Sequence, residues 1–159
     1  MRRTRDIAAL LLGVLLVSVA TTTWARGVRE AAVETETILI EEPWARPAPT
    51  AGGVSAVYFR ITNTGSMPEF LVAAETPVAD HVELHTHIMD GDVARMRMVP
   101  RVELLPGETV ELRPGGLHIM LMDLVEPLPE GEEFMLTLIF EAVPDIELPI
   151  TTQSPPVTR

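Results

Sequence analysis

After residue 36 the chain alternates hydrophobic and polar residues in short runs that end at turn sequences rich in Pro, Gly and Asn. In residues 55–62, for instance, Val57, Phe59 and Ile61 are two residues apart and therefore lie on one face of an extended strand. No helical periodicity is found past residue 26. Many short strands with near-regular turn signals predict an all-β fold, a sandwich or a barrel. The predicted strands are Thr37–Trp44, Ser55–Thr62, Phe70–Ala74, His81–Met89, Val93–Val99, Thr109–Leu112, Leu117–Leu121, Phe134–Glu141 and Ile146–Ile150.

The first 25 residues have a different pattern, which is typical of a secretory signal peptide. Three arginines precede an apolar run at Ile7–Ala20, and Thr23-Trp24-Ala25 fits a small-residue cleavage site. An uncleaved membrane anchor is the alternative, but this run has 14 residues, whereas a spanning helix needs about 20. No Cys lies near the cut, so the segment is not a lipoprotein signal. The mature chain is therefore expected to start near Arg26 and to be exported and soluble.

These patterns divide the chain into four segments. Residues 1–25 are the predicted signal peptide, and residues 26–36 are polar and predicted to be a flexible lead-in. Residues 37–150 are predicted to form one β domain, which agrees with the usual size of a single domain. Residues 151–159 contain two prolines and are predicted to be a loose tail.

The charge is strongly acidic, with a net value of −11 for the whole chain. The signal peptide contributes +2, so the mature chain has a net charge of −13. This balance argues against nucleic acid or an anionic membrane as a partner, because both attract a basic surface. Most of the acidic residues are interpreted as serving solubility.

The chain has no cysteine. Disulfides therefore do not stabilise it, and the hydrophobic core alone must do so. The same absence excludes a blue-copper centre, a Cys-type zinc site, an iron–sulfur cluster and a cysteine nucleophile. An electron-transfer cupredoxin is thus excluded.

Histidine and methionine concentrate in three of the predicted strands. In the third of these, Leu117, Ile119 and Leu121 are predicted to face the core, which turns the intervening residues outward. A strand that merely faced solvent would have Thr, Lys or Glu at those outward positions. The clustered residues are His81, His85, His87 and Met89 in the first strand, Met96 and Met98 in the second, and His118, Met120 and Met122 in the third.

A hairpin turn relates the first two of these strands. If Asp90-Gly91 is a two-residue turn, His85 lies directly opposite Met96 on the outward face. Opposed residues have β-carbons about 4.5–5.5 Å apart, which lets an imidazole and a thioether bind one ion. Thioethers bind Mg²⁺, Ca²⁺ and Zn²⁺ poorly, whereas copper(I) accepts both Met sulfur and His nitrogen. The alternative is that each Met fills the core and each His lies on the surface.

The spacing of four of these residues resembles the signature of the periplasmic copper chaperone family PCu(A)C. That signature is a His, ten residues, a Met, twenty-one residues and His-any-Met, and here it is met by His85, Met96, His118 and Met120. The segments Glu42-Pro43-Trp44-Ala45-Arg46, Asn63-Thr64-Gly65, Val82-Glu83-Leu84-His85 and Pro114 to Leu121 also look like the family. The resemblance covers about residues 38–150.

The resemblance implies a cupredoxin-like Greek-key fold and one exposed copper(I) ion per chain, bound by His85, Met96, His118 and Met120. It also implies that this periplasmic protein passes copper to cytochrome c oxidase assembly, directly or through a Sco-type partner. Two departures are visible. His87 and Ala94 stand where relatives often have further Met, and the tail after residue 150 has no His or Met for a second site.

Three other functions compete with a copper chaperone. A copper-tolerance or storage protein would use the same ligands without a specific acceptor. A metal-free β-sandwich assembly module would bind no copper. An enzyme is the least favoured, because no Ser-His-Asp order and no spaced carboxylate pair can be found.

Overall fold

The computed structural model describes residues 32–91 and 93–155, all of them strand, turn or loop. Since no helix occurs among these residues, none of them forms a membrane-spanning helix. The predicted signal peptide lies outside them. The strands are β1 (Ala32–Glu34), β2 (Ile38–Ala45), β3 (Ser55–Asn63), β4 (Glu69–Glu75), β5 (Ala79–Asp90), β6 (Val93–Met98), β7 (Val102–Leu104), β8 (Thr109–Leu112), β9 (His118–Leu124), β10 (Glu133–Phe140) and β11 (Ile146–Thr152).

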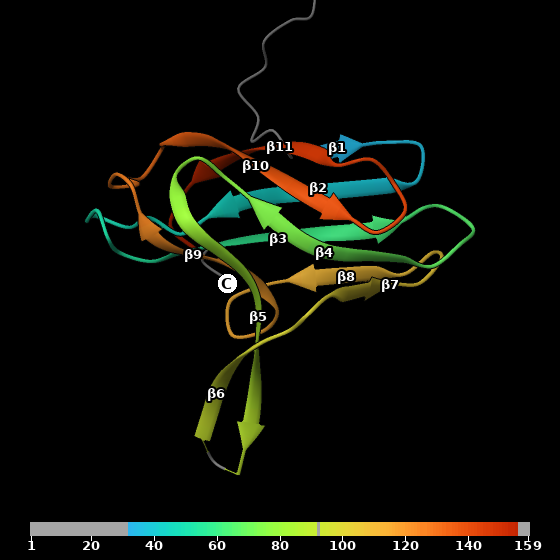
Figure 1. The fold of residues 1–159 in the computed structure, drawn as a ribbon, viewed down its shortest axis with the longest axis horizontal. Coiled ribbons are helices and arrows are strands. Elements are labelled where there is room, and N and C mark those ends of the chain that lie inside the picture. Colours follow the sequence, from blue (N-terminus) through green and yellow to red (C-terminus); the bar gives the residue numbers. More distant parts are fainter. Residues whose placement is uncertain (1–31, 92, 156–159) are drawn as a thin grey trace, which may run out of the picture.

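The strands form one hydrogen-bonded path in the order β6-β5-β9-β3-β2-β11-β10-β4-β7, with β1 added to β2 and β8 added to β3. All pairs are antiparallel except β2 and β11. The path folds over itself into a layered β body, from which one hairpin projects (Figure 1). The predicted all-β sandwich or barrel is therefore confirmed.

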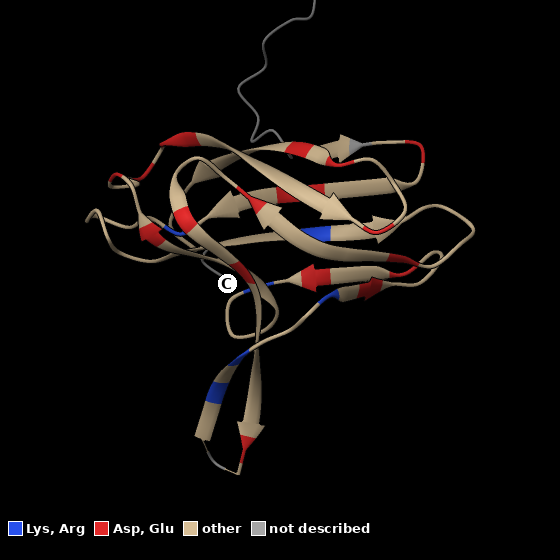
Figure 2. Ribbon diagram, viewed as in Figure 1, with Lys and Arg blue, Asp and Glu red and all other residues tan. Residues whose placement is uncertain are grey.

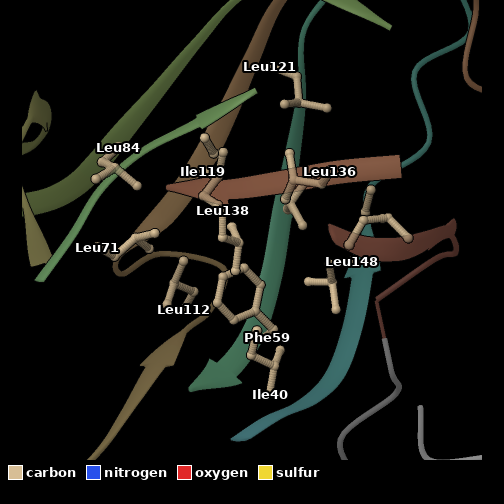
Figure 3. Close-up of a cluster of buried hydrophobic side chains, with 14 of the residues drawn as sticks. Ile40, Phe59, Leu71, Leu84, Leu112, Ile119, Leu121, Leu136, Leu138 and Leu148 are labelled. Atoms are coloured by element: carbon tan, nitrogen blue, oxygen red, sulfur yellow. The ribbon is translucent and has the colours of Figure 1, made fainter. Parts of the chain in front are cut away.

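The core is built from the alternating residues of these strands, and Figure 3 shows part of it. Val57, Phe59 and Ile61 of β3 are at most 2% exposed, as their spacing predicted. Ile119 and Leu121 of β9 are fully buried, which confirms the predicted core face of that strand. Leu117 is only half-buried against the core, because it precedes β9 in the turn where its carbonyl accepts a hydrogen bond from Arg113 N–H.

Two short strands were not predicted. β1 pairs with β2, so the lead-in prediction is wrong for residues 32–34. Thr35 links the two strands, since its hydroxyl accepts a hydrogen bond from Ile38 N–H at 3.0 Å. β7 pairs with β4 and has only three residues, too few to display an alternating pattern.

The last strand is longer than predicted. β11 continues through Thr152, which is 1% exposed, so the prediction of a loose tail is wrong at residues 151 and 152. The Thr152 hydroxyl accepts a hydrogen bond from Glu132 N–H at 2.9 Å and donates one to the Pro129 carbonyl. These two tertiary contacts hold the chain end in the sheet.

The hairpin of β6 and the outer half of β5 projects from the β body (Figure 1). All six residues of β6 are exposed. Arg95 and Arg97 belong to β6 of this hairpin. Most acidic residues are spread over the body (Figure 2). Arg95 binds Asp90 across the hairpin at 2.9 Å.

The register of this hairpin differs from the prediction. Asp90 pairs with Val93, so residues 91 and 92 connect the strands. Gly91 has a φ of 64°, the left-handed conformation that the first position of a tight hairpin turn requires. His85 is consequently opposite Met98, and Met96 is opposite His87. The predicted pairing of His85 with Met96 is therefore wrong, although the two-residue shift leaves both side chains on the predicted face.

Candidate metal centre

Three neighbouring strands bring the predicted ligands to one edge of the β body. β9 pairs with β5, which in turn pairs with β6. His85 lies directly opposite His118 across the first pair, and Met120 lies opposite Glu83 two positions along it. Because directly paired residues share a face, the His and Met side chains of all three strands gather on one side.

His118 is the most buried of the predicted ligands, with 3% of its surface exposed. Its ring centre lies 6.3 Å from that of Tyr58, 6.0 Å from that of His85 and 5.4 Å from that of His87. The prediction that β9 turns its His outward is therefore wrong for His118, since neighbouring rings cover it. At His118, the face of β9 opposite the core is therefore buried as well.

The hydrogen bond of His118 selects its free nitrogen. Nδ1 lies 2.9 Å from the carbonyl oxygen of Gly116. A carbonyl only accepts, so Nδ1 bears the proton and Nε2 keeps its lone pair. Burial lowers the pKa of His118 below its ordinary value, the bond to Gly116 opposes this shift, and the neighbouring His87 and His85 add to it. A neutral imidazole with a free nitrogen is the form that binds a metal.

His85 is held from the other side by Glu83. Its Nε2 lies 2.6 Å from a carboxylate oxygen of Glu83, two residues earlier on the same face of β5. The second ring nitrogen, Nδ1, is buried and has no hydrogen-bond partner among the described residues. A carboxylate that orients one nitrogen while the other stays free is a common arrangement around metal-binding histidines. Glu83 thus orients His85, whereas the sequence had indicated only that it marked an outer face.

The two methionines and His118 line one shallow hollow of about 330 Å³. Met96 is 41% exposed and Met120 is half-buried, so the hollow opens to solvent on the hairpin side. His85 does not line this hollow, whereas His87 does. The structure therefore brings Met96, His118 and Met120 together and places His85 beside the ring of His118.

A family described as "Putative lipoprotein LpqE-like" matches residues 38–152, nearly the whole described part of the chain. The chain belongs to this family. The family is the PCu(A)C family, so the resemblance inferred from the ligand spacing is confirmed.

Two relatives illustrate the breadth of this family. The "Putative lipoprotein Lxx21020" of Leifsonia xyli subsp. xyli is 30% identical over 139 residues, which cover 87% of this chain and 81% of that protein. The "Uncharacterized protein RP573" of Rickettsia prowazekii is 36% identical over 104 residues, which cover 63% of this chain and 58% of that protein. The first match extends the similarity over most of both chains.

Solved PCu(A)C domains have the same fold. The "Apo PCuAC domain from PmoF1" superposes with a TM-score of 0.66 at 23% identity, over 79% of this chain and all of that domain. The solution structure of CuI-DR1885 from Deinococcus radiodurans superposes with a TM-score of 0.57 at 31% identity, over 72% of this chain and 78% of that one. The predicted cupredoxin-like fold is thereby confirmed.

An aromatic pair packs beside the candidate metal centre of this PCu(A)C chain. Trp44 and Tyr58 are both buried, with ring centres 4.6 Å apart, and Tyr58 also lines the hollow next to His118. Burial raises the pKa of Tyr58 above its ordinary value, against the opposing effect of Arg46. Tyr58 stays a neutral phenol at physiological pH. Sequence reasoning singled out Trp44 only within a family segment and missed Tyr58, which occupies a polar-face position of β3.

The side chains around His118 include soft metal ligands, namely the Met thioethers. Within residues 32–91 and 93–155 no three His, Asp or Glu side chains converge on one point. The remaining histidine, His81, is exposed and paired with Asp123 at 3.1 Å, away from the hollow. The groups that gather around His118 are imidazoles and thioethers, a set that suits copper(I) better than zinc or magnesium.

Proposed function

We propose that this protein is a copper(I)-binding metallochaperone, and that His85, Met96, His118 and Met120 bind one copper(I) ion per chain. One observation carries the proposal, namely that Met96, Met120 and His118 line one hollow, while the bond to Gly116 leaves the second ring nitrogen of His118 free. His85 adds its buried, unpartnered Nδ1 from the paired strand.

The distances between the rings agree with a shared ion. With metal–nitrogen bonds of about 2 Å, two imidazoles on one ion have ring centres up to about 6.3 Å apart. The ring centres of His85 and His118 are separated by 6.0 Å, which lies within this limit. Met96, being 41% exposed, is the donor that an approaching protein can reach.

A carrier has to release its ion as well as bind it. The exposed fraction rises from buried His118 to exposed Met96, which favours transfer of the ion to a partner that approaches from the hairpin side. We infer that the protein acts in the periplasm and delivers copper for cytochrome c oxidase assembly, to the oxidase copper domain itself or to a Sco-type protein. A relative at 31% identity solved with copper(I) bound supports the choice of cargo.

Anaerobic titration of the apo protein with copper(I), against a competing chelator, tests the binding step. One tight equivalent is expected, and it should be lost in a variant with both Met96→Ala and Met120→Ala. The matched control is Met67→Ala, because Met67 is 73% exposed on a distant turn. If the wild-type protein withholds no copper(I) from the chelator, the proposed function is wrong.

Transfer is tested separately. Copper-loaded protein mixed with an apo oxidase copper domain, or with an apo Sco-type protein, should lose its ion faster than it does to buffer alone. If the ion leaves at the same rate with and without each acceptor, delivery is refuted and a storage role explains the site.

A further inference from the structure

His87 lies in the hollow but does not belong to the four-residue spacing. It pairs directly with Met96 across the β5–β6 hairpin and lines the same hollow as Met96, His118 and Met120. Its ring centre is 5.4 Å from that of His118, closer than the 6.0 Å of His85. By position alone His87 is as well placed for the ion as His85.

The nitrogen of His87 that faces the protein lacks a partner. Nδ1 is buried, and no described residue hydrogen-bonds to it. A buried polar atom without a partner is costly in a folded protein, typically about 1–3 kcal/mol. Only three such side-chain atoms occur in the described residues, and two of them are the Nδ1 atoms of His85 and His87. A metal ion would satisfy either nitrogen.

Both β5 histidines lie next to the ring of His118. His85 and His87 are two residues apart on one face of β5, and both ring centres are within reach of an ion bound to His118. Among the described residues no group of three His, Asp or Glu side chains is placed to hold one ion, so His85 and His87 are candidates for the same coordination position beside His118.

We propose that His85 and His87 are interchangeable ligands of one copper(I) ion, so that the site has two overlapping ligand sets. In the inner set His85 binds the ion together with Met96, His118 and Met120, and in the outer set His87 takes the place of His85 beside the same three residues. Exchange of one imidazole for the other breaks one copper–nitrogen bond and forms another, with no change in oxidation state. It moves the ion toward the projecting hairpin, where a partner can reach it. This inference rests on the proposed function.

A double-mutant cycle tests the exchange. His85→Gln and His87→Gln should each lower the copper(I) affinity by less than about 10-fold, because the other imidazole replaces the missing one, whereas the double variant should lose at least about 100-fold. The matched control is His85→Gln with His81→Gln, since His81 lies on the same strand but is paired with Asp123 outside the hollow. This control should bind like His85→Gln alone.

Several results would overturn the exchange. A complete loss of binding in either single variant would show that one histidine is indispensable. Equal affinities of His85→Gln and the double variant would show that His87 is not a ligand, and wild-type affinity in the double variant would exclude both. Failure of the proposed function is recognised separately, because then the wild-type protein binds no copper(I), or loss of Met96 and Met120 has no effect.

Discussion

Neighbouring residues of β9 offer a direct test of which face packs and which face binds. Ile119 is fully buried in the core, and Ile119→Ala removes three carbon atoms. At about 0.8 kcal/mol for each buried carbon, the lost transfer free energy is about 2.4 kcal/mol. The cavity left behind raises the expected loss of stability to about 3–5 kcal/mol. Ile119→Val removes one carbon and should cost about 0.5–1.5 kcal/mol.

Met120 is the contrasting residue. Its side chain is half-buried and lines a hollow that already opens to solvent, so its removal enlarges that hollow rather than creating a closed cavity. Met120→Ala should therefore cost the apo protein about 1 kcal/mol or less. It should lower the copper(I) affinity by at least about 10-fold, because one of the two thioethers is lost.

Denaturant unfolding of the apo proteins and copper(I) competition with a chelator measure the two effects independently. Ile119→Ala should lower the unfolding midpoint and leave the copper(I) affinity of the folded fraction unchanged. Met120→Ala should leave the unfolding midpoint nearly unchanged and lower the copper(I) affinity. If Met120→Ala destabilises the apo protein as much as Ile119→Ala and binds copper(I) like the wild type, Met120 is a packing residue and the assignment of the two faces is wrong.

Three further predictions concern polar residues around the site and in the core. Glu83→Ala should lower the copper(I) affinity no more than His85→Gln does, by a factor of about 2–5, because Glu83 acts only by orienting the His85 ring. Glu83→Gln should bind closer to the wild type, and equal affinities of Glu83→Ala and the wild type in a chelator competition would contradict this role. Glu69→Ala should lower the free energy of unfolding by about 2–4 kcal/mol, because the buried carboxylate accepts hydrogen bonds from three backbone N–H groups. Denaturant unfolding measures this loss. A change within about 0.5 kcal/mol would show that these hydrogen bonds are dispensable. Because burial lowers the pKa of His118, the unfolded chain binds its proton more readily, and apo stability should fall as the pH drops below about 6.5. His118→Gln should remove this part of the pH dependence, so parallel stability curves of the two proteins between pH 7 and 5 would refute the assigned shift.

The fold class could be predicted because the core follows the period of a strand. Val57, Phe59 and Ile61 alternate in the sequence, and all three are buried on one face of β3. β1 and β7 could not be predicted, since a strand of three residues has no period to detect and is defined by its neighbour. Thr152 was missed for a related reason, because its burial depends on contacts with Pro129 and Glu132, which lie 23 and 20 positions back.

The residues of the candidate site could be predicted from the sequence, but their burial could not. The spacing selected His85, Met96, His118 and Met120, and three paired strands bring these residues to one edge. Alternation distinguishes the two faces of β9, yet it contains no information about what covers the second face. The burial of His118 results from the rings of Tyr58 and the two β5 histidines, which only the folded chain brings beside it.

The hairpin register shows why sequence alone left the His–Met pairing open. Asp90-Gly91 and Gly91-Asp92 are both acceptable sequences for a two-residue turn, and the two registers differ by two positions. A shift of two positions keeps every side chain on the same face of its strand, so hydrophobic burial does not discriminate between the two registers. All of β6 is exposed, so this strand has no buried side chain that could select a register. The structure has the second register: Gly91 has a left-handed backbone and Asp90 does not, and His87 pairs with Met96. Since both registers place an imidazole opposite Met96, His85 in one and His87 in the other, the presence of two histidines on β5 keeps a nitrogen donor beside that sulfur in either register.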